Sequence, residues 1–334
     1  MSPRALTAAI ALLLALTACT DTPGTIETSA EGPMTSTGAA PSTPTTTSAP
    51  DSTPTTASAP STAAPESSTT TGAPTPIEPD QTLLYGNYIR TESYGDGLEL
   101  DIHAPAEVGP WPVVVTIHGG GWLVGDRSGM GPLADGLASR KAVVFNATYR
   151  TLTLGGRFPG MADDIACAVQ FARIAASEFT TTPDVVTVVG YSAGAHLSSL
   201  VAYAPGEFGQ DCPEGPSSSP DAFVGLAGPY DISQLGGLLT PMFGVAPEQD
   251  PELWAAANPF SWIDDSPDIP TLLLHGDADD VASIAFSEEL AAALEAAGRD
   301  VTFEVLQGRG HSDANAPRVV GDRIAAFLSG LGSP

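Results

Sequence analysis

The sequence predicts an α/β domain in which helices cover both faces of a mostly parallel sheet. Strand-like apolar runs alternate with helix-like runs over roughly the last 250 residues, a length that suits one domain. This alternation is typical of parallel sheets covered by helices. The expected strands are residues 113–117, 142–146, 185–189, 222–226, 271–274 and 302–306. The expected helices are residues 132–140, 161–178, 192–204, 283–297 and 317–328.

The first 19 residues have the features of a secretion signal. Arg4 precedes an apolar run of about fourteen residues, which is too short to span a bilayer as a stable helix. The run ends in Leu-Thr-Ala-Cys, which resembles the bacterial lipoprotein cleavage box. On this interpretation the mature chain begins at Cys19, carries a lipid on its sulfur and is anchored to the cell membrane outside the cytoplasm. The alternative is an ordinary secretory signal, which would release the protein.

Residues 20–80 differ in composition from the rest of the chain. They are mainly Thr, Ser, Pro, Ala and Gly, with few large apolar side chains. Such a segment cannot bury enough apolar surface to offset its chain entropy, so it is expected to be disordered. A coil of about 60 residues spans roughly 40–50 Å, and more where proline extends it. We therefore expect a tether that carries a folded domain comprising residues 81–334.

The folded domain is strongly acidic. After residue 80 the chain has 11 Lys and Arg residues and 32 Asp and Glu residues, a net charge of −21. This charge excludes nucleic acid as a partner by any electrostatic route. It also repels anionic substrates and anionic membrane surfaces. A neutral small molecule is therefore the expected ligand.

Residues 190–194 read Gly-Tyr-Ser-Ala-Gly and lie between an expected strand and an expected helix. In this strand–turn–helix context, G-x-S-x-G presents a serine on a sharp turn, where its hydroxyl is accessible to a base. Glycine at positions 190 and 194 removes side chains that would collide with neighbouring backbone in such a turn. The pattern therefore makes Ser192 a candidate nucleophile.

A second glycine-rich motif, His-Gly-Gly-Gly-Trp, follows the expected strand 113–117. Consecutive glycines leave backbone N–H groups unshielded, and acyl transfer needs such donors for the anion of its tetrahedral intermediate. The expected donors are the N–H groups of Gly120, Gly121 and Ala193. The alternative is a flexible turn without a chemical role.

The base and the acid should follow the serine along the chain. His275 and His311 are the two later histidines that could serve, and His311 lies in a loop after the last expected strand. Loops at strand ends carry catalytic groups in α/β folds. The expected base is His311, and the acid should come from the loop after residue 274. By position, Asp277, Asp279 and Asp280 all qualify.

On these motifs, residues 85–331 resemble an α/β-hydrolase of the lipase and esterase group with an HGGG oxyanion motif. The chain is similar to the hormone-sensitive-lipase-like and feruloyl-esterase-like carboxylesterases. Residues 270–281, PTLLLHGDADDV, resemble that group's acid loop, H-G-x-x-D-x-x-V, and the resemblance selects Asp279 as the acid. The chain departs from the group at Ala282 and Ser283, where a proline is often found, and at Asp280, where other members have a neutral residue. These departures leave Asp280, and less so Asp277, as alternatives.

The resemblance implies a serine carboxylesterase for small to medium acyl esters, with catalytic residues Ser192, Asp279 and His311. It needs no cofactor, and the sequence contains no HExxH motif and no Cys/His cluster at metal-ligand spacing. The alternatives are an arylformamidase or amidase, a lipase on the same triad, or a tethered binding protein without catalysis. An intact set of motifs argues against the binder.

Two features remain open. A Pro- and Gly-rich insert at residues 228–262 contains several aromatic side chains and could form a small lid or a structural excursion packed on the core. Cys167 and Cys212 form an even pair, which outside the cytoplasm often becomes a disulfide.

Overall fold

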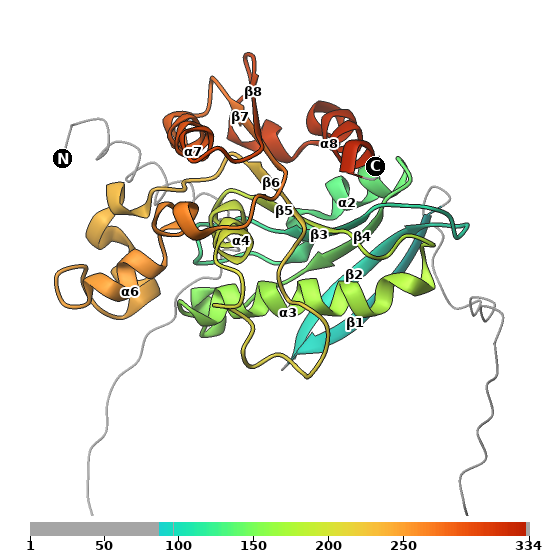
Figure 1. The fold of residues 1–334 in the computed structure, drawn as a ribbon, viewed down its shortest axis with the longest axis horizontal. Helices are drawn as coiled ribbons and strands as arrows, with labels where there is room; N and C mark the ends of the chain where they lie inside the picture. The colour runs from blue at the N-terminus through green and yellow to red at the C-terminus, as the bar shows by residue number, and fades with distance from the viewer. Residues whose placement is uncertain (1–86, 96, 332–334) are drawn as a thin grey trace, which may run out of the picture. The chain divides into compact units, whose positions relative to one another are not determined.

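A computed structural model describes residues 87–95 and 97–331. The predicted signal at residues 1–19, the lipidation site Cys19 and the tether at residues 20–80 lie outside these described residues. Within the described residues, eight strands form one sheet in the order β1-β2-β4-β3-β5-β6-β7-β8. Strands β1, β2 and β4 pair antiparallel, and all later pairs are parallel (Figure 1). The predicted α/β class with a mostly parallel sheet is therefore confirmed.

The strands follow the apolar runs closely. They are β1 (Asn87–Gly95), β2 (Leu98–Pro105), β3 (Val113–Ile117), β4 (Val143–Ala147), β5 (Val186–Tyr191), β6 (Ala222–Leu226), β7 (Thr271–Gly276) and β8 (Val301–Leu306). Five consecutive residues of β3 are buried, as expected for a strand covered on both faces. The six expected strands leave out the antiparallel strands β1 and β2. Strand β1 lies at the sheet edge, and its sequence, NYIRTESYG, has no apolar run.

Helices cover both faces of the sheet. The helices are α2 (Gly131–Ala138), α3 (Gly160–Ala175), α4 (Ala193–Tyr203), α5 (Thr240–Phe243), α6 (Pro251–Ala256), α7 (Ala285–Ala296) and α8 (Pro317–Leu331). Short 3-10 turns occupy Arg127–Gly129, Leu152–Leu154, Ala176–Glu178, Ile232–Gln234, Gly236–Leu239, Pro259–Ser261, Ile263–Asp265 and His311–Asn315. Helices α2 and α8 pack on one face and α3 on the other (Figure 1).

The alternation of side chains along the strands assigns them to two cores. Val113, Val115 and Ile117 of β3 pack in the cluster that includes α3, α4 and α7, whereas Val114 packs in the cluster that includes α2 and α8. Successive side chains of a strand point to opposite faces, so a strand buried on both sides must be apolar at every position. The sheet is therefore held between two apolar layers, and its loops remain available for chemistry.

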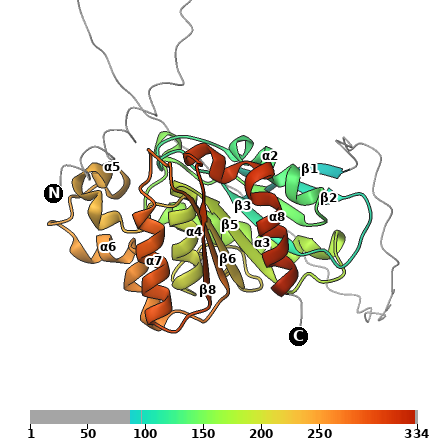
Figure 2. The same ribbon diagram turned by 90° about the horizontal axis from the view of Figure 1, so that it is seen from above.

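The insert at residues 228–262 contains α5 and α6 and lies beside α4 and α7 at one end of the domain (Figure 2). Its large side chains are mostly buried, among them Tyr230, Met242, Phe243 and Trp254. The rings of Phe243 and Trp254 stack with centroids 4.0 Å apart. An apolar lid that opens would expose these rings to water, so their burial favours a packed structural excursion over a mobile lid.

The structure joins Cys167 of α3 to Cys212 in the loop before β6 through a disulfide, with Cα atoms 5.3 Å apart. This spacing falls in the usual range for a disulfide. The bond closes a segment of 45 residues that includes β5 and α4. Among the described helices, none is long and apolar enough to span a membrane.

Candidate active site

Ser192 occupies a sharp turn between β5 and α4. Its backbone has φ 54° and ψ −122°, a conformation that residues other than glycine rarely adopt. The N–H of Ser192 donates to the Leu226 carbonyl of the neighbouring strand at 2.8 Å, which holds the turn against the sheet. This is the strained strand–turn–helix geometry that G-x-S-x-G predicts.

The two glycines of the motif are required by close backbone contacts. A Cβ on Gly190 would lie 2.5 Å from the Gly194 carbonyl oxygen, inside van der Waals contact. A Cβ on Gly194 would lie 2.3 Å from the carbonyl oxygen of His118. The turn of Ser192 therefore packs directly against the loop that follows β3, where the HGGG motif lies.

The structure brings Ser192, His311 and Asp279 together in a continuous chain of hydrogen bonds. The Ser192 Oγ lies 3.0 Å from His311 Nε2, and His311 Nδ1 lies 2.7 Å from Asp279 Oδ2. A carboxylate can only accept, so Nδ1 carries the proton and Nε2 accepts from the serine hydroxyl. Nucleophile, base and orienting acid thus stand in the order that nucleophilic catalysis needs.

Asp279 is fully enclosed, and its four hydrogen-bonding contacts occupy both oxygens. Oδ1 accepts from the N–H groups of Val281 and Ala282, each at 2.9 Å. Oδ2 lies near His311 and also 3.1 Å from Nε2 of His275. Burial alone raises the pKa of Asp279, but the hydrogen bonds from His275 and His311 outweigh it and hold that pKa well below its usual range. The carboxyl is therefore ionised at neutral pH.

The two alternative acids do not reach His311. Asp277 is exposed and accepts the Gly308 N–H at 2.6 Å, which fixes the loop after β8. Asp280 is also exposed. Of the three carboxylates that the sequence left open, the structure places only Asp279 against the histidine.

His275, the other histidine that could serve as the base, contacts the same Asp279 oxygen as His311, at 3.1 Å. It is fully buried, with Nδ1 2.7 Å from Ser287 Oγ and Nε2 2.9 Å from the Ala282 carbonyl. Its contact with Asp279 was not predicted, although the i, i+4 spacing in H-G-x-x-D places His275 at the end of β7 and Asp279 in the loop that follows. His275 therefore supports the acid rather than acting on the serine.

Tyr191 is another neighbour of the site that the motifs did not single out. Its ring centroid lies 5.1 Å from that of His311, and its hydroxyl donates to the His311 carbonyl at 3.3 Å. Burial raises the pKa of the Tyr191 hydroxyl, so it stays protonated and remains a donor. Tyr191 thus holds the backbone of the loop that carries the histidine.

The HGGG loop lies beside the serine. A Cβ on Gly119 would be 2.9 Å from Ser192 Cβ, so only glycine permits this approach. Gly120 and Gly121 both have positive φ, 117° and 61°. Ala193 is the first residue of α4, so its N–H has no intrahelical partner and lies at the positive end of the helix dipole. Among the described residues, the N–H groups of Gly120 and Gly121 donate to no backbone carbonyl.

His118 at the start of this loop has a supporting role. Its Nδ1 lies 2.7 Å from the Gly119 carbonyl, and its ring stacks on Tyr149 with centroids 4.4 Å apart. Burial lowers the pKa of His118, so the ring is neutral and Nδ1–H donates to that carbonyl. His118 therefore stabilises the backbone conformation at the start of the HGGG loop.

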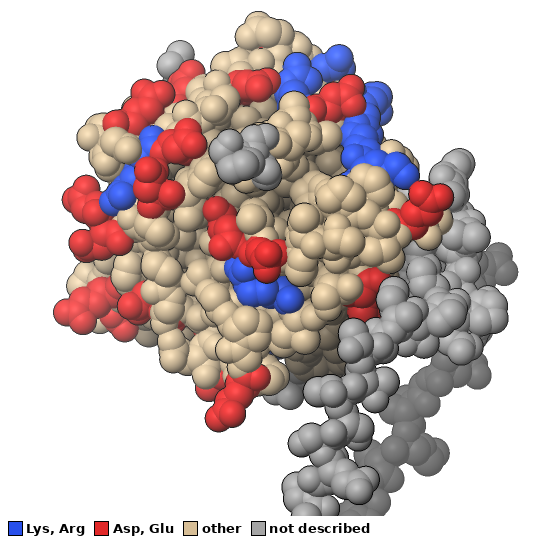
Figure 3. All heavy atoms as spheres, turned by 45° about the vertical axis from the view of Figure 1, so that its right-hand side comes forward, with Lys and Arg blue, Asp and Glu red and all other residues tan. Residues whose placement is uncertain are grey.

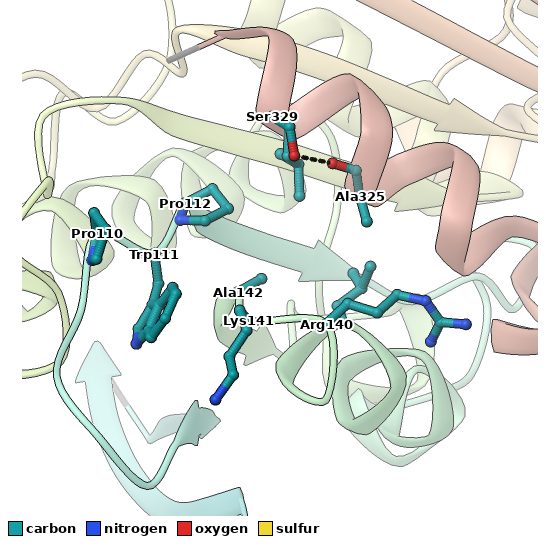
Figure 4. A pocket seen from close by; sticks show the side chains of 10 residues that line it. Pro110, Trp111, Pro112, Arg140, Lys141, Ala142, Ala325 and Ser329 are labelled. Carbon is teal, nitrogen blue, oxygen red and sulfur yellow. Dashed lines mark hydrogen bonds between the residues drawn. The ribbon is translucent and has the colours of Figure 1, made fainter. Parts of the chain in front are cut away.

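Among the described residues, no group of three His, Cys, Asp or Glu could hold a metal ion. A cavity of about 200 Å³ lies near the start of β3 and the end of α8 (Figure 4). Its two cations are engaged, because the Lys141 ammonium lies over the Trp111 ring at 5.1 Å and Arg140 bonds to Asp322 at 2.7 Å. No triad residue lines this cavity.

Comparison with known proteins agrees with this fold. The chain is 28% identical over 237 residues to esterase LipC of Mycobacterium tuberculosis, covering 66% of this chain and 58% of that protein. It is 26% identical over 251 residues to a probable isoprenylcysteine alpha-carbonyl methylesterase, ICMEL1, of Arabidopsis thaliana, covering 70% and 51%. The chain therefore spans just over half the length of these curated relatives.

Solved structures show the same fold. A truncated carbohydrate esterase from gut microbiota superposes with a TM-score of 0.64 at 21% identity, covering 72% of this chain and 95% of that one. The propionate-bound esterase Est2 of Thermogutta terrifontis gives a TM-score of 0.62 at 22% identity, covering 74% and 95%. The model of the BD-FAE family matches residues 100–294, which is more than half of the chain. This chain has the α/β-hydrolase fold and belongs to the BD-FAE family.

Proposed function

We propose that this chain is a serine carboxylesterase that hydrolyses small to medium acyl esters. The observation that carries the proposal is the unbroken set of hydrogen bonds from Ser192 through His311 to Asp279. Ser192 Oγ attacks the acyl carbon while His311 Nε2 takes its proton and then delivers it to the leaving alcohol. Water, with His311 again as base, attacks the acyl-serine and releases the acid. Asp279 keeps His311 in the required tautomer and stabilises the imidazolium.

The oxyanion of the tetrahedral intermediate is assigned to the N–H groups of Gly120, Gly121 and Ala193. Three features support this assignment: the close approach of Gly119 to Ser192, the position of Ala193 at the start of α4, and the lack of a backbone acceptor for the two glycine N–H groups among the described residues. Removing one donor of an oxyanion hole typically lowers kcat by about 10²–10³. No metal and no organic cofactor takes part in this mechanism.

Ester substrates are favoured over amides by the names of the relatives, which include several esterases. The negative charge of the domain favours neutral or cationic esters. A packed insert in place of an open apolar lid favours short and medium acyl chains over the long chains of a lipase. An arylformamidase or amidase on the same triad is the second candidate, and only substrate comparison separates it.

We also propose that the enzyme works outside the cytoplasm, anchored to the membrane by a lipid on Cys19. The support is the cleavage-box sequence at residues 16–19 together with the Cys167–Cys212 disulfide, a bond typical of oxidising compartments. Cys19→Ser should move the protein from the membrane fraction to the soluble fraction. Full-length protein that stays soluble with Cys19 intact would contradict the anchor.

The catalytic proposal is tested by hydrolysis of p-nitrophenyl esters from acetate to palmitate, with residues 81–334 and with Ser192→Ala. We expect turnover that peaks at short or medium chains and falls by about 10⁵–10⁶ in the variant, as for loss of a serine nucleophile. A parallel assay with N-formyl anilides measures the competing activity. A folded protein without turnover on any ester would overturn the proposal.

A further inference from the structure

A buried relay of hydrogen bonds runs from the HGGG loop through α4 to the insert. The indole Nε1–H of Trp122, the residue after the three glycines, donates to His196 Nδ1 at 3.2 Å. His196 Nε2 lies 2.8 Å from the Ala257 carbonyl. Trp122 and His196 are both almost completely buried, and their rings meet edge to face with centroids 5.4 Å apart. The relay thus joins three segments that lie far apart in sequence.

The partners of His196 define one protonation state. An indole N–H only donates, so Nδ1 must keep its lone pair, and a carbonyl only accepts, so Nε2 must carry the proton. Burial lowers the pKa of His196 to about 4, which keeps the ring neutral at physiological pH. A second proton on Nδ1 would face the Trp122 N–H, two donors without an acceptor. Both nitrogens are therefore satisfied in a single tautomer.

The HGGG loop needs an anchor of this kind. Gly121 and Trp122 both have φ 61°, and for tryptophan this left-handed backbone is strained. The backbone of Trp122 is held by its carbonyl, which accepts from the Leu152 N–H at 2.9 Å. The indole bond to His196 fixes the side chain from the other direction. The strained stretch that contains the candidate oxyanion donors is therefore held at its C-terminal end.

His196 also lies on the helix that begins with the third candidate oxyanion donor, the Ala193 N–H. His196 lies on the first turn of α4, three residues after Ala193, and that helix begins directly after the nucleophile. A hydrogen bond between Trp122 and His196 therefore fixes the glycine N–H groups relative to the Ala193 N–H. Oxyanion donors act through their fixed position, and small displacements reduce their effect steeply.

We propose that His196 is a positioning residue. It keeps the N–H groups of Gly120 and Gly121 at a fixed position relative to the Ala193 N–H, and the Ala257 carbonyl of the insert fixes its tautomer. This inference rests on the proposed esterase function. It also connects the insert to the oxyanion hole, because the carbonyl of residue 257 contacts His196. Loss of the relay should weaken binding of the tetrahedral state more than binding of the ester.

The test compares His196→Leu, His196→Asn and Trp122→Phe with the wild type. Leucine removes both hydrogen bonds, whereas the Asn Oδ1 can still accept from Trp122 in the place of Nδ1. For each variant we would measure kcat and KM on p-nitrophenyl acetate. We would also measure the Ki of 1,1,1-trifluoro-2-octanone, which forms a hemiketal with Ser192 whose oxygen takes the position of the oxyanion.

We expect His196→Leu and Trp122→Phe to lower kcat and raise the inhibitor Ki by roughly 10- to 100-fold. KM should change less than about twofold, because the lost contact acts in the tetrahedral state. His196→Asn should recover part of both effects. The matched control is His103→Leu, a buried histidine of β2 whose Nδ1 pairs with Asp135 at 2.8 Å. It should lower the melting temperature without changing kcat or Ki.

Two outcomes would overturn the inference while the wild type is active. One is that the single variants His196→Leu and Trp122→Phe both fold and both keep kcat and Ki near the wild-type values. The other is a fall in kcat that matches a rise in KM and leaves Ki unchanged, which would show a disturbed substrate pocket. A wild type inactive on every ester would instead overturn the proposed function, and the inference with it.

Discussion

Asp279 shows how a buried carboxyl can remain charged. A carboxylate offers about four lone-pair sites, and here His311, His275 and two backbone N–H groups occupy them. Burial favours the neutral acid, whereas each donor favours the anion. The donors prevail, and the pKa of Asp279 is lowered. The immediate neighbours of Asp279 therefore offset the cost of enclosing this charge, so the triad depends on His275 and on the backbone after Asp279 as well as on its own three residues.

Asp279→Asn tests this at the level of one residue. The asparagine NH₂ cannot accept from His311, so the histidine loses the tautomer that receives the serine proton. We expect kcat on p-nitrophenyl acetate to fall by about 10⁴, with KM nearly unchanged. Asp280→Asn, at an exposed position, is the control and should retain wild-type kcat. Equal losses in the two variants would contradict the assignment of the acid.

Asp279→Asn should also change how the free energy of unfolding depends on pH. Because the folded pKa of Asp279 lies below its unfolded value of about 4, the carboxylate stabilises the fold fully above pH 4. That contribution is lost as the pH falls through the folded pKa. In urea unfolding, the deficit of Asp279→Asn against wild type should therefore be larger at pH 7 than at pH 3. A deficit that grows towards acid would contradict the direction of the shift.

At the level of elements, the sequence predicted the buried strands best. The bounds of β3 and β6 match the apolar runs at 113–117 and 222–226, because strands covered on both faces must be apolar throughout. The ends of α2, α3 and α7 moved by one to three residues, since helix ends depend on tertiary contacts. The edge strand β1 carries no such run, so neither its existence nor its antiparallel pairing was predicted.

For the candidate site too, the sequence predicts local features better than contacts between residues far apart in the chain. Local motifs identify Ser192 and its glycines, because the turn they form is local. Position along the chain leaves three aspartates open, and only the resemblance to the acid loop selects Asp279. The carboxylate that faces His311 is set by a contact across 32 residues of sequence. The relay through His196 joins residues that no local motif connects. Its partners, Trp122 and Ala257, lie 74 and 61 residues away.

The disulfide allows a test at the same scale. It closes 45 residues, and restricting the unfolded chain in this way stabilises a fold by about 2–4 kcal/mol. The double variant Cys167→Ser and Cys212→Ser should lose this amount in urea unfolding, and a reductant should lower the wild type to a similar level. Its kcat should not change, because both cysteines lie outside the triad loops. Equal stability of oxidised wild type and variant would contradict a structural role.

At the level of the whole molecule, the dominant property is the excess of acidic side chains. Figure 3 shows Asp and Glu spread over much of one face, with Lys and Arg confined to a few clusters. Several of the described cations are paired with carboxylates, among them Arg127, Arg173 and Arg323, so they do little to offset the field. A net charge of −21 on the domain should therefore attract cationic esters and repel anionic ones as they approach.

This field predicts how salt changes the specificity constant. At low salt, a cationic ester is attracted to the protein and an anionic ester is repelled, and added salt screens both effects. Between about 10 and 500 mM NaCl, we expect kcat/KM to fall several-fold for acetylthiocholine and to rise for 4-acetoxybenzoate. The value for p-nitrophenyl acetate, a neutral control, should stay within about twofold. If all three esters respond to salt alike, the acidic surface does not govern substrate access, and selection among esters then depends on contacts close to Ser192.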